Sequence, residues 1–262
     1  MALLTGKSAL VTGSTSGIGL AMAQALAAEG ANVMLNGFGD PDAIERTRSA
    51  LAEETGVSVG YHGADLSRPD EIEELVEAAA AAHGPIDILV NDAGIQHTDR
   101  VEDFPVAKWD AILAINLSSA FHSTRLVVAG MRERGWGRII NTASAHGIVA
   151  SVEKAGYVAA KHGVIGLTKV VGLENAGTGV TCNAISPGWV RTPLVETQIV
   201  ALAEKNGVSV EEGAKLLLGG KQPSLQFVQP HQVGAAAVFI CSPAADQMTG
   251  ANLSMDGGWI AQ

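Results

Sequence analysis

Seven short apolar segments alternate with longer segments of helical periodicity along the chain. This alternation predicts repeated strand-helix-strand units, which form a parallel sheet with right-handed crossovers and helices on both faces. The predicted strands are Ser8–Thr12, Asn32–Leu35, Val57–His62, Ile86–Asn91, Arg138–Thr142, Val180–Ile185 and Asn252–Met255. The predicted helices are Gly17–Glu29, Asp42–Thr55, Pro69–His83, Val106–Arg134, Ala155–Leu173 and Pro230–Cys241.

Several predicted strands, such as Ile86–Asn91, are apolar almost throughout, which is typical of strands that helices cover on both faces. No shift in composition within the 262 residues marks a linker. We therefore expect a single doubly wound α/β domain over residues 1–262, with a Rossmann-type parallel sheet of about seven strands.

The stretch 192–228 interrupts the alternation. It contains two further helical segments, Leu194–Lys205 and Val210–Leu218, separated by Asn206-Gly207. The stretch is too long for a simple connection, and ligands of open α/β sheets lie beyond the carboxyl ends of the strands. We therefore expect it to form a helical lid over the substrate, or else an oligomer contact.

The net charge of −10 and the pI near 5.1 argue against nucleic acid or an anionic membrane surface as a partner. The two cysteines, Cys182 and Cys241, are far apart and have no metal-ligand spacing, so we expect neither a disulfide framework nor a metal site. Residues 1–12 do not resemble a signal peptide, and no apolar run approaches the ~20 residues that a membrane span requires. We expect a cytoplasmic protein.

A glycine-rich turn follows the first predicted strand and opens the first predicted helix. Gly13, Gly17 and Gly19 would allow a tight turn and a close approach of the backbone to a pyrophosphate. The helix N-terminus behind them would supply free N–H groups and a partial positive charge. A surface turn can carry a similar pattern, but the strand-turn-helix context favours dinucleotide binding.

NAD is the predicted form of the dinucleotide, because no cation near Ser14 or in the segment 36–39 could hold the 2′-phosphate of NADP. The acidic residue that commonly binds the ribose of NAD is also absent, since Asn36 stands there. Phe38 could lie against the adenine or pack within its loop. Asp65 could bond the adenine amino group or cap the helix that follows.

Tyr157 and Lys161 stand four residues apart on a predicted helix, and Ser144 precedes Tyr157 by thirteen residues. An ammonium about 4 Å from the phenol would lower the pKa of Tyr157 by ~1–2 units from its usual value, and an oxidised nicotinamide would add a second positive charge. We expect Tyr157 to take the proton of a hydroxyl while hydride leaves the same carbon, and Ser144 to hold the oxygen. Each residue alone could be structural; their spacing and the glycine turn together favour catalysis.

These motifs resemble the short-chain dehydrogenase/reductase family over essentially the whole chain. The matching segments are residues 12–19, 91–94, Asn116, Ser144, Tyr157 with Lys161, and Pro187-Gly188. The resemblance implies a homotetramer, a proton-relay water held by Asn116, a bond from Lys161 to the nicotinamide ribose, and a contact of Thr192 with the carboxamide. The cofactor-binding residues that it implies are Gly13, Thr15, Ser16, Gly17, Ile18, Gly19, Phe38, Asp65, Leu66, Asn91, Ala93, Gly94, Tyr157, Lys161, Pro187, Gly188, Val190 and Thr192.

One position departs from the family pattern. The family usually has a second asparagine after Asn91, where this chain has Asp92. An ionised carboxylate accepts hydrogen bonds but cannot donate one, so a neighbouring carbonyl could lose its partner. We expect a modest cost in stability or cofactor affinity without loss of the chemistry.

Further segments resemble the branch of the family that oxidises (R)-3-hydroxybutyrate to acetoacetate with NAD. They are residues 94–97, 144–147, 152–154, 188–196 and 221–227. The resemblance implies a carboxylate pocket of Gln96, His146, Lys154, Gln198 and Trp259, with Trp189 as an apolar wall. Lys154, Tyr157 and Lys161 would share one helix face if the helix extended back to Lys154. Each pocket residue alone could instead be a surface or packing residue.

Two other functions compete with this one. A relative acting on another substrate, such as a ketoacyl carrier-protein reductase, would favour a basic surface at the cleft and a cation for NADPH, and neither is evident. A non-catalytic dinucleotide-binding module is disfavoured because Ser144, Tyr157 and Lys161 are all present.

Overall fold

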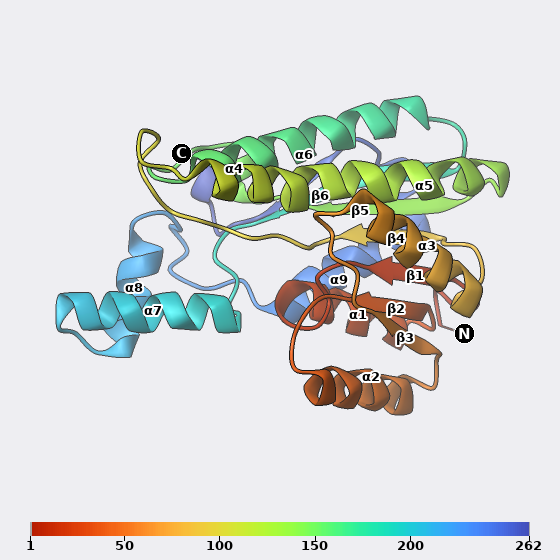
Figure 1. The fold of residues 1–262 in the computed structure, drawn as a ribbon, viewed down its shortest axis with the longest axis horizontal. Coiled ribbons are helices and arrows are strands. Elements are labelled where there is room, and N and C mark those ends of the chain that lie inside the picture. The colour runs from red at the N-terminus through yellow and green to blue at the C-terminus, as the bar shows by residue number, and fades with distance from the viewer. Residues whose placement is uncertain (1, 262) are drawn as a thin grey trace.

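The computed structural model describes residues 2–261, apart from the side chain of Leu194. Its centre is a parallel sheet with the strand order β3-β2-β1-β4-β5-β6-β7 (Figure 1). The chain builds the sheet outward from β1 to β3 on one side and from β4 to β7 on the other, so the switch point lies between β1 and β4. The strands are β1 (Ser8–Val11), β2 (Asn32–Asn36), β3 (Val59–His62), β4 (Ile88–Asn91), β5 (Gly137–Thr142), β6 (Val180–Pro187) and β7 (Asn252–Met255). The predicted doubly wound sheet is confirmed.

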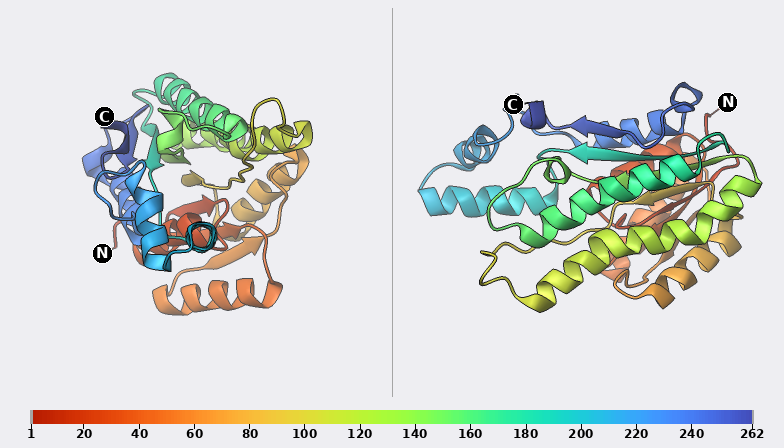
Figure 2. Two further views of the ribbon diagram at one scale, coloured as in Figure 1. Left: turned by 90° about the vertical axis from the view of Figure 1, so that its left-hand side faces the viewer. Right: turned by 90° about the horizontal axis from the view of Figure 1, so that it is seen from above.

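Helices cover both faces of the sheet. They are α1 (Gly17–Ala28), α2 (Pro41–Thr55), α3 (Pro69–His83), α4 (Val106–Leu113), α5 (Ser119–Glu133), α6 (Ala155–Glu174), α7 (Pro193–Asn206), α8 (Val210–Gly219) and α9 (Pro230–Cys241). One apolar core lies between the sheet and the α1, α2 and α9 side, where α1 packs against α9. A second lies under α3, α5 and α6, and Figure 2 shows α5 and α6 running alongside each other on that face.

The predicted helix over 106–134 is wrong in one respect, because a π-helical turn, Ala114–Ser118, separates α4 from α5. Within it the Asn116 amide donates to the Ile95 carbonyl at 3.0 Å and accepts from the Ile95 N–H at 2.8 Å. These long-range bonds accompany the widened turn, and sequence periodicity does not report them.

The combined run Val106–Glu133 is long and apolar enough to cross a membrane by length and composition alone. The expectation that no run approaches this length was therefore wrong. The run packs against α3, α6 and the strands β4 and β5, which are the contacts of a core helix in this fold. That packing buries 39% of its most apolar window.

Helices α7 and α8 fill most of the stretch 192–228 and pack against each other (Figure 1, left). Thr192 caps α7 by accepting from the Val195 N–H, and Ser209 with Glu212 forms a capping box at α8. The pair stands beyond the carboxyl ends of the strands, beside the body of the domain. Its function as a lid stays a prediction.

We predict that Gly19→Ala lowers the free energy of unfolding by about 2–4 kcal/mol, because an added Cβ would lie 2.4 Å from the Gly13 carbonyl oxygen and 2.8 Å from Asp92 Oδ2. The exposed Gly219 provides the control, since a Cβ there meets nothing closer than 4.0 Å. Urea unfolding of both variants measures the difference. Equal stabilities would contradict the close packing of this turn.

Candidate active site

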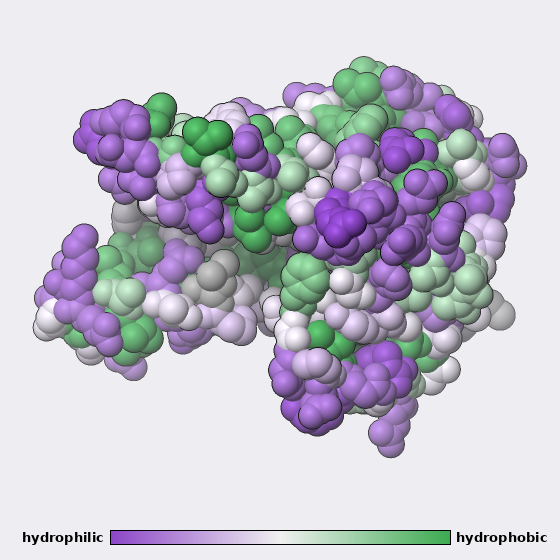
Figure 3. Space-filling model, viewed as in Figure 1, coloured by the Kyte–Doolittle hydropathy of each residue, from purple (hydrophilic) through white to green (hydrophobic). Residues whose placement is uncertain are grey.

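A cleft of about 450 Å³ opens at the carboxyl ends of the central strands. Figure 3 shows the surface hollowed between the body of the domain and the α7–α8 pair. Its lining comes from the turns after β1, β2, β3, β4 and β5, from α6, and from the segment that leads from β6 into α7. This is the place where open parallel sheets bind their ligands.

The glycine turn forms the floor of one end of this cleft. Gly13 and Gly17 have φ of 64° and 60°, and a Cβ on Gly13 would lie 2.7 Å from the Ala93 Cα. The N-cap of α1, Ser16, makes no capping bond with its side chain, and the first turn of α1 contains no acidic residue. The N-terminal amides of α1 are therefore available to a phosphate, so the residues present fit a pyrophosphate group.

The turns after β2 and β3 line the adjoining part of the cleft. Asn36 is buried and donates to the His62 and Ala64 carbonyls, so its amide is engaged in the sheet. Phe38 is 68% exposed, and Asp65 accepts from the Ser67 N–H at 2.9 Å as in a turn before a helix. The described lining contributes no Lys or Arg here, since its cations, Lys154 and Lys161, belong to α6 and the residue before it.

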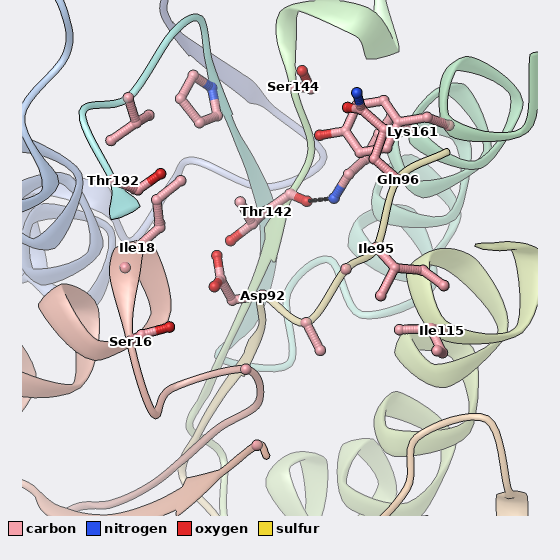
Figure 4. A pocket seen from close by; sticks show the side chains of 18 of the residues that line it. Ser16, Ile18, Asp92, Ile95, Gln96, Ile115, Thr142, Ser144, Lys161 and Thr192 are labelled. Atoms are coloured by element: carbon pink, nitrogen blue, oxygen red, sulfur yellow. Dashed lines mark hydrogen bonds between the residues drawn. The ribbon is translucent and has the colours of Figure 1, made fainter. Parts of the chain in front are cut away.

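Ser144, Tyr157 and Lys161 all line the cleft. Figure 4 shows Ser144 and Lys161 on the same side of it. Lys161 is buried and donates to the Thr142 carbonyl at 2.5 Å, and its Nζ lies 5.6 Å from the centroid of the Tyr157 ring. Ser144 caps a 3₁₀ turn by accepting from the His146 N–H at 3.2 Å. The end of β5 and the start of α6 thus bring a hydroxyl, a phenol and an ammonium to one wall.

The pKa of Tyr157 is shifted in the direction opposite to our expectation. Burial raises it, and the hydrogen bond with Ser144 lowers it by less than that, while the negative charge of Asp92 adds to the rise. Burial also lowers the pKa of Lys161 to about 8, against the opposing effect of Asp92. Desolvation of each group outweighs the attraction that the sequence led us to expect.

Asp92 points into the space between the glycine turn and β5 (Figure 4). Burial raises the pKa of its carboxyl to about 6, although hydrogen bonding by Thr142 and the Gly19 amide and the charge of Lys161 lower it. Its Oδ1 is buried without a hydrogen-bond partner among residues 2–261. The cost in stability or cofactor affinity expected at this position stays a prediction, and desolvation of the carboxylate is its physical basis.

Three of the predicted site residues do not line the cleft. Gly19 packs against the Gly13 backbone, and Asn91 bonds to Asn141 and Ser123 in the interior. Asn116 holds the backbone of Ile95, which does line the cleft. These residues shape the walls of the site in this structure, and the relay water assigned to Asn116 stays a prediction.

The other end of the cleft combines aromatic rings with basic groups. All six predicted substrate residues line it, namely Gln96, His146, Lys154, Trp189, Gln198 and Trp259. The Trp189 and Trp259 rings stack with centroids 6.1 Å apart, and the Lys154 Nζ lies 5.3 Å from the Trp189 centroid. Burial and the charge of Lys221 lower the pKa of Lys154. No acidic residue is paired with Lys154 by a salt bridge in the described chain.

Lys154 is not part of the helix, contrary to the arrangement considered from the sequence. Its φ of −120° and ψ of 33° make it the N-cap of α6, and its carbonyl accepts from the Val158 N–H. It still reaches the same cleft as Tyr157 and Lys161. Sequence reasoning missed Thr142, which anchors Lys161, and Ser151, whose hydroxyl contacts His146; no local signal marks either one.

We predict that Asp92→Asn raises the free energy of unfolding by about 2–3 kcal/mol near pH 7.5. With a folded pKa of about 6 against an ordinary 3.8, the folded state keeps a proton that the unfolded state has lost. Wild-type stability therefore falls as pH rises through this window and stays lower above it, so the gain should disappear near pH 4. Chemical unfolding across pH tests this, with the exposed Asp103→Asn as control. A pH-independent difference would contradict the explanation.

Known proteins are similar to this chain over nearly its whole length. A family model described as enoyl-(acyl carrier protein) reductase matches residues 13–260. The D-beta-hydroxybutyrate dehydrogenase of Cupriavidus necator is 58% identical over 99% of this chain and 100% of its own, and that of Rhizobium meliloti is 50% identical over 98% and 99%.

Solved structures agree with these relationships. L-sorbose reductase from Gluconobacter frateurii, solved with NADPH and L-sorbose, superimposes with a TM-score of 0.94 at 29% identity over 100% of both chains. An actinorhodin polyketide ketoreductase solved with NADPH gives 0.90 at 37% identity over 98% of both chains. This chain therefore belongs to the short-chain dehydrogenase/reductase family, and it is an oxidoreductase that uses a nicotinamide dinucleotide.

Proposed function

We propose that this protein oxidises (R)-3-hydroxybutyrate to acetoacetate with NAD and catalyses the reverse reduction. The observation that carries the proposal is the unpaired cation Lys154 beside His146, at the end of the cleft that also holds Tyr157. A short hydroxy acid places a carboxylate two bonds from the carbinol carbon, so one group can bind the anion while another handles the hydroxyl. The two hydroxybutyrate dehydrogenases at 58% and 50% identity support this substrate.

The proposed chemistry needs a base at the hydroxyl and a donor for the oxygen. Tyr157 takes the hydroxyl proton in the oxidation and returns it in the reduction, while Ser144 donates a hydrogen bond to the same oxygen. When bound, the oxidised nicotinamide supplies the hydride acceptor and a positive charge that favours the phenolate. The hydrogen bond with Ser144 opposes the desolvation that raises the pKa of Tyr157. Lys161 is proposed to add a positive charge from α6, where its Nζ lies 5.6 Å from the centroid of the Tyr157 ring.

The preference for NAD rests on the absence of cations in the described lining around Asn36, Gly37 and Phe38. The 2′-phosphate of NADP would bring a charge of about −2 to this region without a partner. The Nδ2 group of Asn36 donates to two backbone carbonyls, whereas its Oδ1 is buried without a hydrogen-bond partner among the described residues. Asp65 and Leu66 remain the polar and apolar contacts proposed for the adenine.

The acidic chain is proposed to act in the cytoplasm as a homotetramer. The exposed apolar side chains Phe121 on α5 and Val170 and Leu173 on α6 support an association through this helical face. No nucleic acid or membrane partner is proposed. Size-exclusion chromatography with light scattering measures the assembly directly.

We predict rapid reduction of NAD by (R)-3-hydroxybutyrate, with little or no reduction by the S enantiomer and at least about tenfold lower kcat/KM with NADP. NADH absorbance follows each pairing. Tyr157→Phe should abolish turnover while NADH fluorescence titration shows binding within about twofold of wild type. Binding of NADH without oxidation of either enantiomer would overturn the substrate and favour a different alcohol, such as a ketoacyl reductase substrate.

We further predict that Lys154→Met raises KM for (R)-3-hydroxybutyrate about 10- to 100-fold, because it removes a charge-assisted hydrogen bond to the carboxylate. The Kd for NADH should change less than about twofold. Lys215→Met on the exposed side of α8 is the matched control and should leave both constants unaltered. Equal effects of Lys154→Met on KM and on the Kd for NADH would contradict carboxylate binding.

A further inference from the structure

We propose that Ser151 and Lys221 are positioning residues for His146. The Ser151 hydroxyl donates to Nε2 of His146 and thereby holds the neutral imidazole in its Nδ1–H form. The Nδ1–H group then donates to the substrate carboxylate. The inference deepens the proposed function and rests on it for the identity of the ligand. Neither Ser151 nor Lys221 lines the cleft, so both act through His146.

The hydrogen bonds among Lys221, Ser151 and His146, here called the relay, determine which group donates to which. His146 Nε2 lies 2.7 Å from Ser151 Oγ, and the Lys221 ammonium donates to the same oxygen. An ammonium has no acceptor, so the Ser151 proton cannot go to Lys221. Among residues 2–261 the Ser151 hydroxyl has no acceptor other than His146 Nε2. The opposite tautomer would leave that hydroxyl proton without an acceptor among the described residues.

The surroundings of His146 keep its ring neutral. Burial lowers the pKa of His146 to about 4, and the positive charges of Lys154, Lys221 and His162 act in the same direction. The remaining neighbours are aromatic, since the Trp259 ring lies 5.0 Å and the Tyr157 ring 5.9 Å away, both edge-on. A neutral imidazole donates through only one nitrogen, so its tautomer decides whether it can bind an anion.

The free nitrogen is on the side of the ring away from Ser151. No hydrogen bond to His146 Nδ1 is formed within the described chain, whereas Nε2 is engaged. His146 lines the cleft with Lys154 and Trp259. A donor at Nδ1 would therefore complement the cation at Lys154, while a lone pair there would repel a carboxylate.

The relay also connects two separate parts of the chain. Ser151 lies between the 3₁₀ turn Ala145–Gly147 and α6, whereas Lys221 follows Gly220, the C-cap of α8. The Lys221 Nζ also lies 5.4 Å from the centroid of the Trp259 ring. The end of the stretch 192–228 thus takes part in setting the hydrogen-bonding state of a residue in the cleft.

A neutron crystal structure of the deuterated full-length protein near pH 7.5 tests the tautomer without any substrate. We expect a deuteron on His146 Nδ1, none on Nε2, and the Ser151 deuteron directed at Nε2. A deuteron on Nε2 would overturn the proposal. Because this readout needs no turnover, it separates failure of the relay from failure of the proposed substrate.

Kinetics of variants tests the consequence for binding. Ser151→Ala should raise KM for (R)-3-hydroxybutyrate about 5- to 30-fold, with kcat and the Kd for NADH within about twofold of wild type. Ser151→Thr keeps the hydroxyl and should restore KM to within about threefold. An unchanged KM in Ser151→Ala, or a loss that Ser151→Thr does not restore, would show that the hydroxyl does not position His146.

Discussion

The burial of the Lys161 ammonium beneath the cleft is the constraint on which the rest of the site depends. Its bond to the Thr142 carbonyl joins α6 to the end of β5, and this joint places Tyr157 and Ser144 on one wall. Removing a cation from water costs free energy, and the carboxylate of Asp92 offsets part of that cost. The wall that contains Lys161 and the residue after β4, Asp92, are therefore electrostatically coupled.

The neighbouring part of the cleft, around Lys154 and His146, differs because no carboxylate of the described residues forms a salt bridge with its cations. Lys154 and Lys221 lie near each other with aromatic rings between them and no acidic partner in the described lining. Lys154 lines the cleft, whereas Lys221 lies outside the lining and donates to Ser151. The charges of both cations favour an anionic ligand at this end. The amides at the start of α1 are available to the dinucleotide phosphates, so under the proposed function the two anionic groups would have different binding sites.

Much of this arrangement follows from local features of the chain. The alternation of apolar segments predicted seven strands, and Pro69–His83, Pro230–Cys241 and Asn252–Met255 have their predicted bounds. Tyr157 and Lys161 lie about one turn apart on α6, as their four-residue spacing predicts, because helical periodicity depends only on neighbouring residues. The failure at 106–134 has a long-range cause, since Asn116 bonds to a backbone 21 residues away.

The sequence by itself determined the order of the strands and helices, the glycine turn and the residue types available for proton transfer. Only the tertiary structure decided the direction of the Tyr157 pKa shift, the burial of Asp92 and the bonds that join Ser151 to His146 and to Lys221. The physical reason is that desolvation and hydrogen bonding depend on which distant segments exclude water and meet in space. Periodicity and propensity describe only what each segment does with its own neighbours.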